Sequence, residues 1–289
     1  MGSKLRWHRE NTRPYFVKDG YFFMEVKVMK RKVALAQMDI QLGLPEANYQ
    51  KTARAIKAAA DHHADIIVLP EMWNTGYALN KLKDIADNNG QKTQQFLSKL
   101  ALENKINIVG GSVAIRRGTS FYNTSYIYDQ TGQLIGTYDK VHLFGLMDEN
   151  QYLKAGVKES HFALAGIPSA SFICYDLRFP EWVRTTARHG ADILYFPAEW
   201  PSSRIKQWKI MLQSRAIENQ AFVVAVNRVG TDLDNDFNGH SLVIDPLGNI
   251  ISDAGEEERV SYAEVDLEKL AEVRGPIPVF KDRRPELYH

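Results

Sequence analysis

Short apolar runs alternate with longer amphipathic stretches along most of the chain, from about residue 32 to residue 265. Short apolar runs bounded by turn-prone residues are typical of buried strands, whereas apolar residues spaced three and four apart are typical of helices packed on a sheet. Helices are therefore predicted over residues 45–62, 93–104, 181–189 and 204–218. Strands are predicted over residues 33–39, 65–70, 106–114, 122–129, 134–138, 169–174, 192–196, 221–227, 240–245 and 259–265.

The order of these elements predicts one α/β domain with helices layered on sheets. Helices follow several strands, but Gly132 marks a hairpin turn between two neighbouring strands, and this mixture argues against a purely parallel barrel. Because no tract rich in proline, glycine or serine interrupts residues 30–270, the domain is expected to cover residues 30–289. The first predicted helix is expected to direct four residues toward the sheet: Ala53, Ile56, Ala59 and Ala60.

Residues 1–29 differ in character from the rest of the chain. They mix aromatic residues with charges and lack the continuous apolar stretch of a signal peptide. Met24 and Met29 each offer a start before the first predicted strand. We therefore expect residues 1–29 to be an N-terminal extension, either vector-derived or produced by an upstream start.

The composition of the chain mainly excludes certain classes of protein and partner. The chain is 44% hydrophobic and 25% charged, with 36 basic and 35 acidic residues, so neither a nucleic-acid partner nor an anionic membrane surface is indicated. Its longest apolar stretches, about eight residues, fall well short of the roughly 20 needed to cross a bilayer. The single cysteine excludes an intrachain disulfide framework and a cysteine-rich zinc site, which favours a cytoplasmic location.

That cysteine, Cys174, stands where an apolar run, residues 170–173, meets a polar and turn-prone run, residues 175–180. A free cysteine is usually a buried small hydrophobe, and taken alone Cys174 is best interpreted in that way. Glu71 and Lys140, however, follow other predicted strands in similar settings. Because ligands of α/β folds bind near the carboxyl ends of strands, the three residues together favour a nucleophile.

Glu71, Lys140 and Cys174 supply what cysteine-dependent amide cleavage requires. A free thiol with a pKa near 8.5 is only a few per cent thiolate at neutral pH, so it needs a neighbouring base or cation. Glu71 is the candidate base and Lys140 the candidate cation. The Lys140 ammonium and the backbone N–H of Tyr175 would stabilise the oxyanion formed by attack. Protonated Glu71 would then help to expel ammonia and would activate the water that hydrolyses the acyl-enzyme.

Three blocks resemble the catalytic motifs of the nitrilase superfamily, the carbon-nitrogen hydrolases: residues 69–71 (LPE), 138–144 (YDKVHLF) and 174–180 (CYDLRFP). Their order and spacing match the family, and the resemblance covers about residues 31–288. It implies that Glu71, Lys140 and Cys174 are the family's base, lysine and nucleophile, and that Glu149 is its second glutamate, which orients the lysine or the substrate. It also implies an αββα sandwich that pairs into a homodimer and uses neither a metal nor another cofactor.

Three further segments look most like the omega-amidase branch of the superfamily: residues 74–77 (NTGY), 147–149 (MDE) and 199–201 (EWP). The resemblance implies a small-molecule amide substrate, an α-keto dicarboxylate monoamide such as 2-oxoglutaramate, which is cleaved to the dicarboxylate and ammonia. Two alternatives remain open. One is a hydrolase of nitriles or N-carbamoyl amines from the same superfamily, and the other is a noncatalytic or redox-sensing protein with a reactive thiol, against which the intact catalytic blocks argue.

An omega-amidase pocket must bind a carboxylate, and a guanidinium can do so with two hydrogen bonds. Arg178 and Arg204 are the candidates, and an ion pair of Arg178 with Asp176 or Glu181 carries equal weight as an alternative. Aromatic side chains are candidate pocket walls, although large aromatic residues more often lie in the core. The two candidate walls are Trp200 and Tyr77.

Two other features are assigned structural roles. His142 lies in an apolar block beside Lys140, so it is expected to be packed and hydrogen-bonded rather than to act as a base. Arg215 and Glu218 are three residues apart in a predicted helix and are expected to pair on its face.

Overall fold

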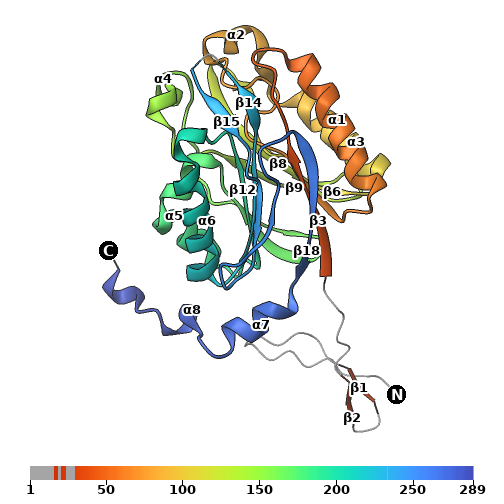
Figure 1. The fold of residues 1–289 in the computed structure, drawn as a ribbon, viewed down its shortest axis with the longest axis vertical. Coiled ribbons are helices and arrows are strands. Elements are labelled where there is room, and N and C mark those ends of the chain that lie inside the picture. The colour runs from red at the N-terminus through yellow and green to blue at the C-terminus, as the bar shows by residue number, and fades with distance from the viewer. Residues whose placement is uncertain (1–15, 19–20, 24–29, 233, 289) are drawn as a thin grey trace.

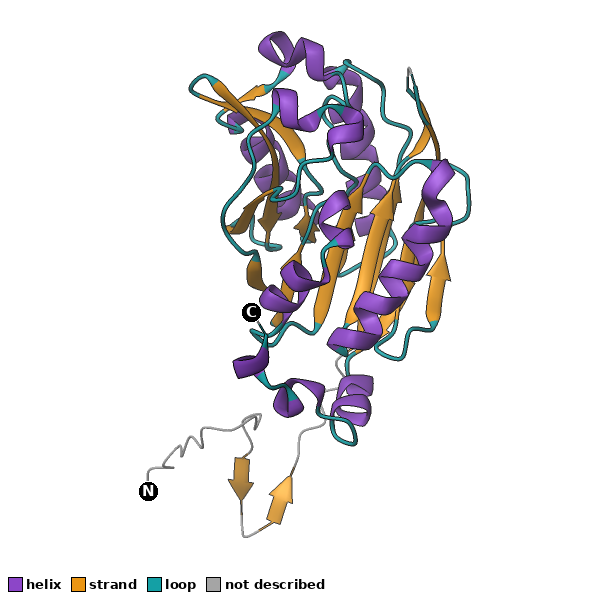
Figure 2. Ribbon diagram, turned by 90° about the vertical axis from the view of Figure 1, so that its left-hand side faces the viewer, coloured by secondary structure: helices purple, strands orange, loops and turns teal. Residues whose placement is uncertain are grey.

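Two β-sheets lie face to face in the middle of the molecule, and helices cover the outer face of each (Figure 1). The computed structural model describes residues 16–18, 21–23, 30–232 and 234–288. Figure 2 shows the second sheet with its covering helices turned toward the viewer. The predicted αββα sandwich is therefore confirmed.

The first sheet has eight strands and is mixed in direction. The three parallel strands β3, β4 and β6 are flanked by antiparallel neighbours. Helices α1 and α3 pack on the outer face of this sheet, and Pro45 opens α1 where its missing N–H costs nothing. The elements are α1 (Pro45–Asp61), α3 (Gln91–Asn104), β18 (Arg259–Asp266), β3 (Lys30–Gln37), β4 (Ile66–Val68), β6 (Asn107–Val109), β8 (Ser120–Tyr128), β7 (Val113–Arg117), β5 (Asp87–Asn88) and β9 (Leu134–Asp139).

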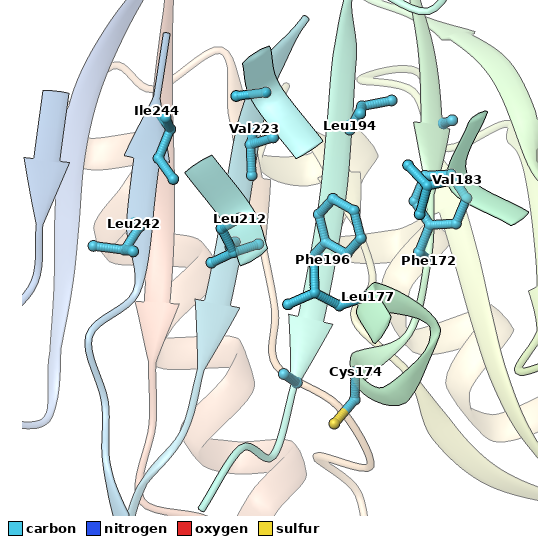
Figure 3. Close-up of a cluster of buried hydrophobic side chains, with 14 of the residues drawn as sticks. Phe172, Cys174, Leu177, Val183, Leu194, Phe196, Leu212, Val223, Leu242 and Ile244 are labelled. Carbon is cyan, nitrogen blue, oxygen red and sulfur yellow. The ribbon is translucent and has the colours of Figure 1, made fainter. Parts of the chain in front are cut away.

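The second sheet has six strands with a parallel centre formed by β11, β12 and β13. Helices α5 and α6 cover its outer face, and Figure 3 shows apolar side chains from the strands and helices meeting there. The elements are β10 (His161–Leu164), β11 (Ile167–Ser171), β12 (Ile193–Ala198), β13 (Phe222–Asn227), β16 (Leu242–Ile244), β17 (Ile250–Asp253), α5 (Pro180–Ala187) and α6 (Ile205–Asn219).

The inner faces of the two sheets are joined by a dry apolar layer. Leu35 and Val68 of the first sheet and Tyr195 and Val224 of the second belong to this cluster, and all four are completely buried. Alternating side chains of a strand point to opposite faces, so strands covered on both sides read as continuous apolar runs. The layer fixes how the strand ends of one sheet face those of the other.

Shorter elements connect and extend the two layers. They are β1 (Phe16–Lys18), β2 (Tyr21–Phe23), η1 (Leu79–Lys81), α2 (Leu82–Ile85), η2 (Gly145–Met147), α4 (Glu149–Tyr152), η3 (Cys174–Arg178), η4 (Ser202–Arg204), β14 (Val229–Thr231), β15 (Asp236–Asn238), α7 (Glu268–Arg274), α8 (Val279–Asp282) and η5 (Pro285–Leu287), where η marks a 3₁₀ helix. The short strands β10, β14, β15 and β17 were not predicted.

The strand predicted over residues 106–114 is wrong as a single element, because the chain turns between β6 and β7. Gly111 has φ +58°, and a Cβ there would lie only 2.0 Å from the carbonyl oxygen of Pro70. Only glycine tolerates this close approach of two backbones in that conformation. The turn therefore brings β7 beside β8 and places Ser112 against the segment that carries Glu71.

Two further details of the prediction are corrected. The strand predicted over residues 169–174 ends at Ser171, and Cys174 instead begins a 3₁₀ helix. The inner face of α1 contains Ile56 and Ala59 as predicted, but Thr52 and Ala55 are buried there, whereas Ala53 and Ala60 are only partly buried. Because several of these residues are small alanines, the sequence pattern distinguishes poorly between the inner and outer faces of the helix. The predicted inner face is therefore rotated by part of a turn.

The proposed boundary near residue 30 lies beside residues that the structure does not describe. Of the predicted N-terminal extension, only the β1–β2 hairpin is described, and residues 1–15, 19–20 and 24–29 lie outside the described residues. The boundary therefore stays a prediction. Within the described ranges, every helix is too short or too polar to span a bilayer.

Candidate active site

The candidate residues lie just beyond the ends of strands that belong to both sheets. Glu71 follows β4 and Lys140 follows β9 in the first sheet. Cys174 follows β11 and Glu199 follows β12 in the second. In Figure 3 the sulfur of Cys174 points away from the labelled apolar side chains, at the edge of their cluster.

Lys140 forms the centre of the site. Its Nζ lies 2.8 Å from Glu71 Oε1 and 2.8 Å from Glu149 Oε1, and all three side chains have no exposed surface. Burial by itself would lower the pKa of Lys140, but the carboxylates of Glu149 and Glu71 outweigh it, and the pKa is raised. Lys140 is therefore a permanent ammonium held between two carboxylates.

Glu71 is bound through both carboxylate oxygens. Besides Lys140, Oε1 accepts hydrogen bonds from Asn123 Nδ2 at 2.8 Å and from Tyr77 Oη at 2.9 Å. Oε2 accepts the backbone N–H of Glu199 at 2.9 Å. A carboxylate held by this many donors has one orientation available, which suits a group that must receive a proton from a fixed direction.

Glu149 opens α4 and reaches inward, whereas its neighbour Asp148 is exposed and accepts a hydrogen bond from Gln151. Glu149 Oε2 accepts the backbone N–H of Phe144 at 2.6 Å. Burial raises the pKa of Glu149, although Lys140 opposes the shift. Between the two neighbouring acids, it is therefore Glu149 that contacts the lysine, as the family resemblance implied.

Tyr77 and Asn123 link the two carboxylates. The Tyr77 hydroxyl lies 2.9 Å from Oε1 of both Glu71 and Glu149, and Asn123 Nδ2 lies 3.4 Å from Glu149 Oε1. Tyr77 was predicted as a pocket wall, and its hydroxyl instead takes part in the charged network. Asn123 was missed, because the predicted strand 122–129 also contains Thr124, Ser125 and Asp129, so one more polar residue does not stand out there.

Cys174 has a strained backbone and a buried thiol. Its φ of +44° is unfavourable for a residue with a Cβ, and its side chain is 5% exposed. Sγ lies 3.9 Å from the carbonyl oxygen of Glu199. Burial, reinforced by the charge of Glu71, raises the pKa of the Cys174 thiol well above its ordinary value. The resting site therefore holds a neutral thiol close to a carboxylate.

The turn that carries Cys174 is held by Asp176. Its Oδ2 accepts the backbone N–H of Ile173 at 2.9 Å and the hydroxyl of Tyr138 at 2.7 Å. Its Oδ1 lies 2.7 Å from His142 Nδ1, and the His142 ring stacks on Phe179 with centroids 3.7 Å apart. The structure agrees with the packed, hydrogen-bonded role predicted for His142, because the ring supports the turn.

Helix α6 supports the same turn from the other side. Arg215 pairs with Glu218 at 3.0 Å, as predicted, but its Nη2 and Nε also bind the carbonyl oxygen of Leu177 at 2.7 and 3.1 Å. Arg215 is only 5% exposed. Arg215, which was predicted to pair with Glu218 on the helix face, is thus buried and also anchors η3.

The residues predicted to bind substrate lie around η3 and η4. The Arg178 guanidinium lies 4.9 Å from the Trp200 ring, and the Arg204 guanidinium lies 5.8 Å from the Phe144 ring. Trp200 is 3% exposed and packs 5.3 Å from Trp208, so most of it belongs to the core. Among the described residues Arg178 forms no ion pair with Asp176 or Glu181, so that alternative is wrong. The Tyr175 ring packs 4.7 Å from Phe144.

No set of three or more His, Cys, Asp or Glu side chains suited to hold a metal ion occurs within residues 30–232 and 234–288. The charged groups of the site are instead bound to one another and to backbone atoms. What the arrangement supplies is a carboxyl group, an ammonium and a thiol in one buried place. These are the parts required for acyl transfer through a cysteine.

The sequence model of the carbon-nitrogen hydrolase family matches residues 32–275, and the chain belongs to this family of enzymes. A 2-oxoglutaramate amidase of Bacillus subtilis is 48% identical over 260 residues, which cover 90% of this chain and 100% of that protein. The human omega-amidase NIT2 is 32% identical, with 89% and 96% covered. The crystal structure of Saccharomyces cerevisiae Nit3, a member of branch 10 of the nitrilase superfamily, superposes with a TM-score of 0.82 at 34% identity, covering 88% of this chain and 97% of that one.

Replacing Lys140 with methionine is expected to lower the free energy of unfolding by about 3 to 5 kcal/mol, because two buried carboxylates would then lack a cation. The loss should increase as pH rises, because the pKa of Glu149 is raised by burial. When the folded pKa of a carboxyl lies above its unfolded pKa, the protonated carboxyl stabilises the folded state. This stabilisation is lost as pH rises through the folded pKa. Urea unfolding followed by tryptophan fluorescence at several pH values measures both effects.

Lys99→Met provides the control, because Lys99 lies on α3 with 70% of its side chain exposed and contacts Glu103 only at 3.8 Å. The free energy of unfolding of this variant should lie within about 0.5 kcal/mol of that of the unmodified protein. An equal loss in both variants, or a loss at Lys140 that does not change with pH, would contradict the role of Lys140 as the required counterion.

Proposed function

We propose that this chain hydrolyses the terminal amide of small α-keto dicarboxylate monoamides such as 2-oxoglutaramate, through a thioester on Cys174 and with release of ammonia. The observation that carries this proposal is the buried ion network in which Lys140 lies 2.8 Å from both Glu71 and Glu149, close to the Cys174 thiol. The relatives named 2-oxoglutaramate amidase and omega-amidase support the choice of substrate. Residues 30–289 are proposed as the catalytic domain.

In the first half of the proposed reaction, Cys174 Sγ attacks the amide carbonyl carbon while its proton passes to Glu71. The raised pKa of the thiol means that this proton leaves as the bond forms, because a free thiolate beside Glu71 is unfavourable. The carbonyl oxygen becomes an oxyanion, which the Lys140 ammonium and the Tyr175 N–H stabilise. Glu71 then gives the proton to the amide nitrogen, the C–N bond breaks, and ammonia leaves a thioester behind.

In the second half, water attacks the thioester carbon and Glu71 removes its proton. The tetrahedral intermediate collapses, the C–S bond breaks, and Glu71 returns the proton to the sulfur. Glu149 keeps Lys140 in place throughout and does not exchange protons with the substrate in this scheme. Glu71 thus serves as base and acid in each half, which fits a carboxyl held by four donors in one orientation.

The substrate carboxylate is assigned to Arg178, with Arg204 as the second candidate. Arg178 lies on the turn of the nucleophile, two residues beyond Asp176, and its guanidinium stacks on Trp200 rather than pairing with an acid. A stacked guanidinium keeps its edge N–H groups available for a bidentate carboxylate. The alternative activity, hydrolysis of nitriles or N-carbamoyl amines, would use the same nucleophile but requires no such carboxylate site.

Ammonia release from 2-oxoglutaramate, a nitrile and an N-carbamoyl amine tests the proposed reaction. We expect turnover of 2-oxoglutaramate to exceed that of the other two substrates by at least about tenfold, and Cys174→Ala to abolish it. Glu71→Gln should lower kcat by about 10² to 10⁴, the usual contribution of a general acid–base group. Intact-mass measurement during turnover should detect an acyl group on Cys174.

Full activity of Cys174→Ala would show that the cysteine is not the nucleophile and would support the reading of Cys174 as a packing or redox residue. Turnover of the carbamoyl amine without turnover of 2-oxoglutaramate would overturn the substrate assignment and leave the cysteine chemistry intact.

Arg178→Met is expected to raise the KM for 2-oxoglutaramate by at least about tenfold, because a charge-assisted bidentate contact is lost. The KM for butyramide, which has no carboxylate, should stay within about twofold. Arg204→Met serves as the matched variant. If only Arg204→Met shows the difference between the two substrates, the carboxylate belongs to Arg204, and if neither does, both assignments are wrong.

A homodimer in the cytoplasm is the proposed context. The C-terminal segment extends along the outside of the domain (Figure 1) and exposes Ile277, Leu287 and Tyr288 by more than half of their surfaces. Apolar side chains in such positions are commonly covered by a partner. Sedimentation equilibrium is expected to give twice the 32.9 kDa chain mass, and removal of residues 276–289 should lower it toward one chain. An unchanged dimer after truncation would exclude this segment as the interface.

A further inference from the structure

The backbone of Glu199 lies between the proposed base and the proposed nucleophile. Its N–H donates to Glu71 Oε2 at 2.9 Å, and its carbonyl oxygen lies 3.9 Å from Cys174 Sγ. The preceding carbonyl, of Ala198, accepts the backbone N–H of Glu71 at 3.5 Å. One peptide segment therefore contacts both residues that exchange a proton in the proposed reaction.

The side chain of Glu199 points into the protein and pairs with Arg228. Glu199 Oε2 lies 2.8 Å from Arg228 Nη1, and both side chains have no exposed surface. Arg228 is itself held by the carbonyl oxygens of Ile40 at 2.9 Å and Val229 at 3.1 Å. The guanidinium thus ties the end of β12 to two backbone segments.

Asn227, which ends β13, holds the next residue of the same segment. Its Oδ1 accepts the backbone N–H of Trp200 at 2.7 Å, and its Nδ2 donates to the Trp200 carbonyl at 3.0 Å. Residues 227 and 228 therefore bind residues 199 and 200 in two ways. The Asn227 side chain clamps the backbone of Trp200, and Arg228 forms an ion pair with Glu199. The Glu199 carbonyl and the Trp200 N–H belong to one planar peptide unit, so the Asn227 clamp fixes the orientation of that carbonyl, whereas the ion pair holds the Glu199 side chain.

A buried ion pair is a costly way to hold a chain together. Removing two charges from water consumes much of the energy that their attraction returns, and apolar residues of similar volume commonly give equal or greater stability. Burial raises the pKa of Glu199 and the Arg228 guanidinium opposes that shift, so the carboxylate depends on the arginine for its charge. The carboxylate oxygen Oε1 has no hydrogen-bond partner within the described residues. What the pair contributes is a defined position of the chain rather than added stability.

We propose that Glu199 and Arg228 are a positioning pair that holds the backbone of residue 199 where it keeps Glu71 and Cys174 at proton-transfer distance. The proposal rests on the proposed cysteine hydrolase mechanism for its effect on turnover. Neither side chain touches the substrate in this scheme. Loss of the pair should therefore slow the chemical step and leave substrate binding largely unchanged.

Glu199→Gln removes the charge and keeps the size of the side chain. We expect the rate of thioester formation from 2-oxoglutaramate, followed by rapid-quench mass spectrometry, to fall at least about tenfold, while KM stays within about twofold. Alkylation of Cys174 by iodoacetamide should slow in parallel, because it depends on the same proton transfer to Glu71. Arg228→Lys, which retains the charge but loses the planar fork, should show a smaller loss of the same kind.

Asp192→Asn is the matched control. Asp192 lies just before the other end of β12 and pairs with Arg274, so this variant also removes one carboxylate from an ion pair of the same strand. Its acylation and alkylation rates should stay within about twofold of the unmodified protein. Rates are normalised to the folded fraction measured by circular dichroism. If Glu199→Gln does not fold, the rates of Arg228→Lys test the proposal instead.

Normal acylation and alkylation rates in the folded Glu199→Gln or Arg228→Lys variant would overturn the positioning role. Equal losses in Asp192→Asn would do the same, because they would assign the effect to general destabilisation of β12. If the unmodified protein does not cleave 2-oxoglutaramate, the proposed substrate fails, but the alkylation rates still test the positioning pair independently.

Discussion

A buried ammonium between two carboxylates is the interaction on which the rest of this site depends. Lys140 Nζ lies 2.8 Å from both Glu71 and Glu149, and none of the three side chains has any exposed surface. Tyr77, Asn123 and two backbone N–H groups supply the remaining hydrogen bonds. Each of these donors has to be placed by a different part of the chain, and this requirement dictates much of the surrounding structure.

The fold meets this requirement by facing the strand ends of two sheets toward one another. Glu71, Lys140 and Asn123 belong to the first sheet and its edges, whereas Cys174 and Glu199 follow strands of the second. The apolar layer between the sheets therefore sets the distance between Glu71 and Cys174. The positive φ of Cys174 is tolerated because Asp176 and Arg215 hold the following turn. Backbone strain of this kind persists only where the surroundings determine the conformation.

Much of this could be predicted from local pattern. Apolar runs marked most of the long strands, because strands buried on both faces must be apolar throughout. Glu71, Lys140 and Cys174 stood out because a charged or reactive residue directly after such a run is conspicuous. Tyr77 and Asn123 were not identified as partners of the carboxylates, since a hydroxyl or an amide within a strand or loop has many possible uses. The ion pair of Arg178, one of two alternatives given equal weight, does not form, and the carboxylate of Asp176 is bound instead by Tyr138 and His142.

The sequence by itself determined the succession of strands and helices, the identity of the reactive residues and the family to which their spacing belongs. These properties are local, and each depends on a short stretch of the chain. Only the tertiary structure decided which groups contact Lys140 and that the backbone of Glu199 lies between Glu71 and Cys174. Those contacts join residues separated by up to 128 positions, and they exist only because the packing of the two sheets brings distant strand ends within hydrogen-bond distance.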